Sequence, residues 1–288
     1  MTSTPSFASI KQRVESRVDA VRIACELEVQ SPKLGNVHPT ARFEDCDYRD
    51  FLNAASEIAP VLGGHDATLS LGDRVLLAVE RTRQVTTSNV NLGIILLVAP
   101  LAMADDILAI RQVLASITSE DGRKVFEAIR LALPGGMRRD DVAPEQDVQT
   151  LHPQPIDLMA AMQQAASRDR IALQYATEFR DFFANVVPVV RAELLHSVSI
   201  HAAIVSAQMI LMSREIDSLI ARKSGIETAE EAKFRASQCV IASERSDGPE
   251  ARARFDVWLR ADGNRRNPGT TADFIAAALF WLLCEPNA

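Results

Sequence analysis

Residues 90–104, VNLGIILLVAPLAMA, form an uncharged stretch that ends at the acidic pair Asp105-Asp106. A second uncharged stretch, FIAAALFWLLC, occupies residues 274–284. Both are shorter than the ~20 apolar residues that a membrane-spanning helix requires. The two stretches therefore predict buried helices at the centre of a helical protein, and no membrane span.

Apolar residues recur at helical spacing along most of the chain, and alternation with a period of two is scarce. A stripe from Ile10 to Cys25 predicts one continuous first helix, which stops at Ser31-Pro32 because a residue before proline disfavours the helical region. We expect an all-α, compact multi-helix single domain over residues 1–288, with its longest loop at about 134–155. Further helices are predicted at 48–58, 71–84, 90–115, 119–133, 156–166, 169–186, 188–222 (with room for a break), 228–243, 249–261 and 270–284.

The charge balance excludes several kinds of partner. The 288 residues carry 31 Lys and Arg against 38 Asp and Glu, a net charge of -7. Nucleic acids and anionic membranes require a positive protein surface, so neither is expected as a partner. A net negative charge is still compatible with a local basic pocket that binds a phosphorylated small molecule. The four cysteines are scattered without a C-x-x-C pair and predict reduced thiols in a cytoplasmic protein: Cys25, Cys46, Cys239 and Cys284.

The common nucleotide and hydrolase motifs are absent from the sequence: it contains no G-x-x-x-x-G-K-[ST], no G-x-G-x-x-G, no H-E-x-x-H and no G-x-S-x-G. His196 and His201 are five residues apart, which does not align them on one helix face as metal ligands. A phosphate site in this chain would therefore not be of a common nucleotide-binding type.

Glu28 continues the apolar stripe of the first predicted helix. A carboxylate on the core side of a helix costs free energy unless it is paired or binds a cation, and the last helical turn is unfavourable for an acid. Violations of local rules concentrate at functional sites. Glu28 is therefore either a functional carboxylate or a helix-end glutamate paired with a nearby Lys or Arg.

Three further polar segments are candidates for anion binding or for ordinary capping. Residues 86–93, TTSNVNLG, open a very apolar helix, and residues 262–273, DGNRRNPGTTAD, place two arginines before another. Capping by Ser88 or Asn89, and a capping box from Thr270 to Asp273, explain both segments without a ligand. Residues 217–225, DSLIARKSG, are typical of a helix stop.

In this order, these segments resemble the triphosphoribosyl-dephospho-CoA synthase family, from Glu28 to about Leu283. The chain also resembles a divergent branch that is associated with methanopterin-type one-carbon cofactor genes. The similar motifs are Glu28-Val29 with Pro32-Lys33 and Gly35, Asp45 with Phe51 and Ala54-Ala55, Asn89-Val90-Asn91 with Gly93, residues 217–225, and Asn267-Pro268-Gly269 with Ala272-Asp273. Departures from the family pattern include Leu34 for a proline, His38 for an aspartate and Leu92 in place of a His-Lys pair.

The resemblance implies an all-helical transferase that displaces adenine from ATP and joins the triphosphoribosyl group to a hydroxyl of dephospho-CoA or a related cofactor precursor. It implies Mg²⁺ with ATP, and homodimerisation is a fair expectation. The implied metal-binding or acid–base residues are Glu28, Asp45 and Asp273. The implied nucleotide- or phosphate-binding residues are Lys33, Gly35, Asn89, Asn91, Asp217, Arg222, Arg265, Arg266 and Gly269.

Two other functions remain open at this stage. The missing His-Lys pair is compatible with a non-catalytic nucleotide-binding protein that acts as a sensor or assembly factor, which would bind ATP without releasing adenine. A helical partner-binding protein without a small-molecule site would instead scatter the motif residues and expose an apolar patch. The retained Lys33, Asn91 and Asp273 favour the enzyme.

Overall fold

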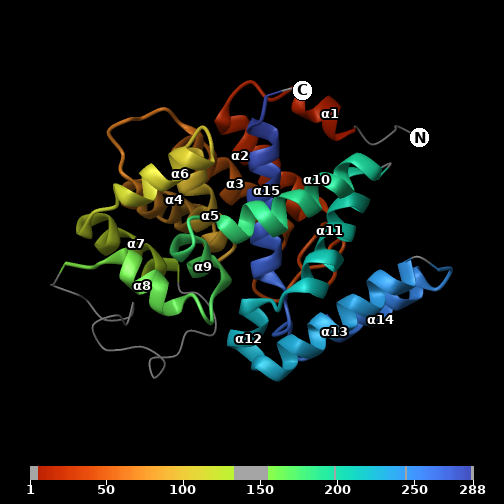
Figure 1. Cartoon of the computed structure of the whole chain (residues 1–288). Helices are drawn as coiled ribbons and strands as arrows, with labels where there is room; N and C mark the ends of the chain where they lie inside the picture. The colour runs from red at the N-terminus through yellow and green to blue at the C-terminus, as the bar shows by residue number, and fades with distance from the viewer. Residues whose placement is uncertain (1–5, 133–154, 198, 244, 287–288) are drawn as a thin grey trace.

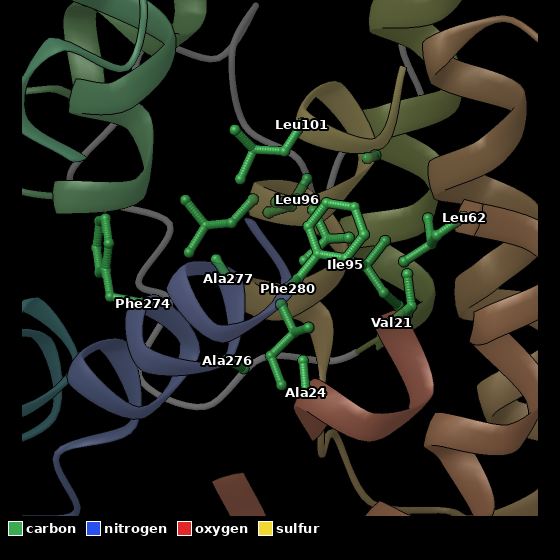
Figure 2. Close-up of a cluster of buried hydrophobic side chains, with 14 of the residues drawn as sticks. Val21, Ala24, Leu62, Ile95, Leu96, Leu101, Phe274, Ala276, Ala277 and Phe280 are labelled. Carbon is green, nitrogen blue, oxygen red and sulfur yellow. The ribbon is translucent and has the colours of Figure 1, made fainter. Parts of the chain in front are cut away.

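The helix α15, Gly269–Cys284, lies at the centre of the molecule (Figure 1). Twelve of its sixteen residues are buried, so it is covered on all sides, as the uncharged stretch 274–284 predicts. It packs against α2 (Arg17–Gln30), α5 (Leu92–Ala102), α10 (Val187–His196) and α11 (Ile200–Arg214). Figure 2 shows the core at this crossing, where Ala276, Ala277 and Phe280 face side chains from the surrounding helices.

The computed structural model describes residues 6–132, 155–197, 199–243 and 245–286. These residues form an all-α, compact single domain as predicted, with no β-strand among them and one isolated bridge, between His38 and Ala41. The predicted loop at 134–155 lies almost entirely outside the described residues. The remaining elements are α1 (Phe7–Lys11), α3 (Tyr48–Gly63), α4 (Leu71–Val85), α6 (Ile107–Ala115), α7 (Ser119–Ala132), α8 (Leu158–Ala165), α9 (Arg170–Ala176), a π-helix (Phe182–Val186), α12 (Ser218–Ser224), α13 (Ile226–Ser243) and α14 (Gly248–Arg260).

Four predicted helices are divided in the structure, and only the last of them, 188–222, was predicted with room for a break. The predicted first helix is wrong at its start, because α1 ends at Lys11 and the Ser16 side chain accepts from Asp19 N to begin α2. The predicted helix at 90–115 is two helices bent by 105°, and Asp106 caps the second. Residues 169–186 contain α9 and the π-helix, and 188–222 contain α10, α11 and α12. In the first two cases a short side chain that accepts a backbone N–H starts a new helix inside the apolar pattern.

A second, smaller core lies beside the first and contains α11, α12, α13 and α14. Leu34 and Leu259 are both buried in it, so the loop that follows α2 is anchored on this layer. Gly35 brings the loop backbone close to α14: its φ is +71°, and a Cβ at this position would lie only 2.8 Å from Leu259 Cβ. The loop therefore connects the central helices to α14, at the place where the motif residues gather.

No described helix is by itself long and apolar enough to cross a membrane. The bent pair α5 and α6 would reach the required length and composition only together. All four cysteines are free thiols, as predicted.

Candidate functional site

A cavity of about 990 Å³ opens among the helices that carry the motifs. Apolar side chains of α5, α7, α8 and α9 line part of it, and polar side chains from the loops and helix N-termini line the rest. The first residues of α5, α13 and α15 belong to the lining. The N-cap residues of α5 and α15 make no side-chain cap bond, although Asn89 accepts from Leu92 N and Asp217 accepts from Thr271 N. Helix N-termini carry a partial positive charge, so the cavity is suited to an anionic ligand.

Glu28 lines the cavity although its side chain is almost completely buried. Its Oε1 lies 2.7 Å from Nζ of Lys33, whose side chain is 0% exposed. The same ammonium donates to the backbone carbonyl of Glu28. Of the two alternatives for Glu28, the ion pair with a nearby lysine is therefore present, and it holds a carboxylate at the cavity wall.

Asp273 is a second carboxylate of the lining, and its side chain is partly buried. Burial raises the pKa of Asp273 well above its usual value, and the charges of Glu28 and Asp217 raise it further. Among the described residues its carboxylate accepts no hydrogen bond, so the capping box predicted from Thr270 to Asp273 does not form. The raised pKa favours the protonated form of this carboxyl group.

Gly93 provides the space that Asp273 occupies. A Cβ at Gly93 would lie 2.0 Å from Oδ2 of Asp273 and 2.9 Å from Cδ1 of Ile171. We expect Gly93→Ala to displace the carboxyl group and to lower turnover on the order of 100-fold, since a shift of about 1 Å has that effect in other active sites. Steady-state kinetics measure this, and a variant with unchanged turnover would show that the position of Asp273 is unimportant. In an Asp273→Ala background, Gly93→Ala should cost less stability than in the wild type, because the carboxylate it would strike is absent.

Asn89 and Asn91 both line the cavity, at the start of α5. Asn89 is exposed, and its Oδ1 accepts from Leu92 N at 3.3 Å. Asn91 is buried, accepts from the Thr82 hydroxyl at 3.2 Å, and has no hydrogen-bond partner at Nδ2. A buried amide nitrogen without a partner is costly, so its presence in the lining favours a ligand acceptor there.

Asp217 does not line the cavity, so its position does not support the predicted phosphate contact. One oxygen accepts from Leu219 N and Ile220 N, and the other accepts from the amide and hydroxyl of Thr271, at 2.7 and 2.8 Å. Burial raises the pKa of Asp217, although these donors oppose the change. Asp217 therefore joins the N-termini of α12 and α15.

We expect Asp217→Asn to lower the unfolding free energy by about 1–3 kcal/mol, because its amide would face the donors of Thr271. Chemical denaturation measures the loss. Wild-type stability together with weakened nucleotide binding would instead indicate that Asp217 contacts the ligand.

Cationic side chains from α12 and the loop before α15 also line the cavity. Arg222 pairs with Asp169 at 3.1 Å, and Arg265 donates to the Lys223 carbonyl at 2.6 Å. Burial, followed by the charge of Arg222, lowers the pKa of Lys223, whereas Asp45 opposes that shift. These groups place positive charge beside the exposed carboxylate of Asp45.

Three predicted phosphate contacts are not supported by the positions of their side chains, and the three residues do not line the cavity. Lys33 faces Glu28. Arg266 lies on the Trp258 ring, 4.4 Å from its centroid, and donates to its carbonyl. Gly35 packs against Leu259. The remaining predicted residues all line the cavity: Glu28, Asp45, Asn89, Asn91, Arg222, Arg265, Gly269 and Asp273.

Several lining residues are not among those predicted from the sequence, including Asn36, Asp169, Lys223 and Asn267. Asn36 and Asn267 stand inside the motifs, and their hydrogen bond of 2.7 Å joins two loops that are far apart in the sequence. Lys223 follows Arg222 in the helix stop, where a basic residue is ordinary. Only the motif context could have indicated these positions.

The three carboxylates predicted as magnesium ligands do not form a ready-made metal site. Among the described residues, no three His, Cys, Asp or Glu side chains come together to hold a metal ion. Asp45 is exposed, and no described donor binds its carboxylate, whereas Glu28 is paired with Lys33. Because Mg²⁺ usually binds one or two carboxylates together with substrate phosphates, the donor set fits an ion that arrives with a triphosphate.

Comparisons with known proteins identify the family of the chain. Residues 15–287 match the family model of the ATP:dephospho-CoA triphosphoribosyl transferases. No curated protein matches the chain significantly. A solved structure from Archaeoglobus fulgidus, described as a candidate triphosphoribosyl-dephospho-CoA synthase, is 25% identical, with a TM-score of 0.61 over 82% of this chain and 97% of that one. The chain therefore belongs to the ATP:dephospho-CoA triphosphoribosyl transferase family.

Proposed function

We propose that the protein transfers the triphosphoribosyl group of ATP to a hydroxyl of dephospho-CoA or a related cofactor precursor, and releases adenine. The observation that carries this proposal is a pair of carboxyl groups, the buried Glu28 and the partly buried Asp273, in the wall of one cavity with cations and helix N-termini. The reaction breaks the bond between ribose C1′ and adenine and forms a bond from C1′ to the acceptor oxygen. It needs a proton for adenine and a base for the hydroxyl.

The two carboxyl groups differ in a way that suits these tasks. Asp273, with its raised pKa, would hold a proton for the departing adenine. Glu28, ion-paired with Lys33, would accept the proton of the hydroxyl and face the positive charge that develops on the ribose. The proton lost by the acceptor thus balances the proton gained by adenine.

The triphosphate would lie near Arg222, Lys223 and Arg265, where the cations of the lining are found. Mg²⁺ would enter as part of the substrate MgATP, with Asp45 as its protein ligand, and would neutralise phosphate charge. Asn91, with its unpartnered amide nitrogen, would donate to a ribose or phosphate oxygen. These assignments give Asp45, Asn91 and the three cationic side chains a partner in the bound substrate.

Adenine release from MgATP, measured by chromatography with and without dephospho-CoA, tests the proposal. We expect adenine only when the acceptor is present, and its loss in Glu28→Gln. If adenine formed only with a different hydroxyl-bearing cofactor precursor, the proposed reaction would be supported and the acceptor would be that precursor. ATP binding without adenine under any of these conditions would contradict the proposal and favour a non-catalytic nucleotide-binding protein.

A further inference from the structure

Three side-chain amides form a continuous chain from the second core to the cavity. Gln208 on α11 donates from Nε2 to Asn36 Oδ1 at 2.8 Å, and Asn36 donates from Nδ2 to Asn267 Oδ1 at 2.7 Å. Gln208 is 0% exposed and Asn36 is 5% exposed. The chain therefore connects a fully buried residue to Asn267 in the cavity lining.

The orientation of the first amide is set by backbone groups that cannot reverse. Leu34 N donates to Gln208 Oε1, and Gln208 Nε2 donates to Leu34 O, both at 2.8 Å. An inverted Gln208 amide would place two donors together and two acceptors together in a buried site. Nε2 must therefore face Asn36.

The orientation of the Gln208 amide sets the orientation of the other two amides. Because Gln208 donates, Asn36 can present only its oxygen to Gln208, and its nitrogen then faces Asn267. Asn267 must in turn present its oxygen to Asn36. The atom that remains on Asn267 is Nδ2, a donor without a described acceptor, which lies beside Gly269 in the lining.

The surroundings of this donor favour an anionic oxygen. It lies at the start of α15, where the helix dipole favours negative charge although the Thr271 amide already donates to Asp217, and Arg265 is in the same loop and the same lining. We propose that Asn267 donates from Nδ2 to a phosphate oxygen of the bound ligand, and that Gln208 and Asn36 are positioning residues that fix this donor. The inference rests on the proposed function only for the identity of the ligand as a triphosphate.

Calorimetric titration of the full chain with inorganic triphosphate tests the role of Asn267. Asn267→Ala should weaken binding about 10-fold, and Asn267→Asp about 100-fold, because the first removes a donor to an anion and the second replaces it with a like charge. The exposed Asn53, outside the lining, provides the charge-matched control Asn53→Asp, which should bind as the wild type does. Wild-type affinity in Asn267→Ala, or no triphosphate binding by the wild type, would overturn the proposal.

The positioning role is tested through Asn36→Asp, which cannot donate to Asn267. The Asn267 amide should then invert and turn its oxygen to the cavity. We expect Asn36→Asp to weaken triphosphate binding about 10-fold in the wild type and by less than about 3-fold in the Asn267→Ala background, a coupling that a general loss of structure would not produce. Equal effects in both backgrounds would contradict the relay.

The two experiments, triphosphate binding and adenine release, test the Asn267 donor and the proposed reaction separately. If Asn267→Ala weakens triphosphate binding while the wild type never releases adenine, the donor is established and the proposed reaction is wrong. If the wild type releases adenine and Asn267→Ala binds triphosphate unchanged, the reaction stands and this inference is overturned.

Discussion

Asp273→Asn is expected to lose adenine release and yet to melt at a higher temperature than the wild type. The carboxyl group is partly buried without a described donor, and desolvation together with the charge of Glu28 raises its pKa well above the usual value. An amide of the same shape avoids the cost of an ionised group there but cannot supply a proton. We expect turnover to fall by about 10²–10⁴-fold. The melting temperature should rise by about 2 °C or more, which corresponds to about 1 kcal/mol in a chain of this size.

The raised pKa of Asp273 determines how the stability of the wild type changes with pH. In the unfolded chain Asp273 titrates near its usual value, about 3.9, whereas its pKa in the folded protein is raised. The folded state thus binds the proton more tightly, and the wild type loses stability as pH rises above about 4 towards the raised pKa. The stability advantage of Asp273→Asn should therefore be absent at pH 3 and grow between pH 4 and neutrality.

Thermal denaturation across this pH range measures the effect. Asp247→Asn makes the same chemical change at an exposed residue whose side chain caps no helix, and it should leave both activity and melting temperature unchanged. An Asp273→Asn protein that is active, or less stable than the wild type at neutral pH, would contradict the role of a proton donor.

Lys33→Met is expected to cause the largest loss of stability. The ammonium is 0% exposed and lies 2.7 Å from Glu28, so its removal leaves a carboxylate buried without a counter-charge. Breaking a buried pair in this way costs about 3–5 kcal/mol. At about 2–4 °C per kcal/mol, this loss of unfolding free energy lowers the melting temperature by roughly 6–20 °C.

The double variant Glu28→Gln/Lys33→Met separates the ion pair from packing. It should recover most of the lost stability, because neither charge then remains buried, but it should stay inactive because the carboxylate is absent. Chemical denaturation of the two single variants and the double variant measures the coupling. If Lys33→Met were as stable as the wild type and only raised the KM for ATP, Lys33 would contact phosphate directly, as the sequence resemblance implied.

The sequence was sufficient for the fold class and for part of the site. The uncharged stretch at 274–284 indicated the central helix, because a helix without a polar face must be covered on all sides. The position of Glu28 on an apolar stripe indicated a buried carboxylate that needs a partner. Both conclusions follow from local periodicity.

The remaining features depend on contacts between distant segments. The sequence gives the type of a residue such as Lys33 or Arg266, but the direction of its side chain is decided by packing against Glu28 or Trp258. The helix break at Ser16 escaped prediction because the apolar stripe continues through it. The amide chain from Gln208 to Asn267 joins residues from three separate segments, and only the folded structure brings them together.

The fate of ATP labelled in two places tests the central claim most directly. ATP with carbon-14 in adenine and phosphorus-32 in the γ-phosphate would be incubated with the protein and dephospho-CoA, and the products separated by chromatography. The proposed reaction predicts that carbon-14 appears as free adenine and that phosphorus-32 moves to the acceptor, in equal amounts. Release of labelled phosphate or of ADP, with no free adenine, would show that the cavity does not transfer a triphosphoribosyl group.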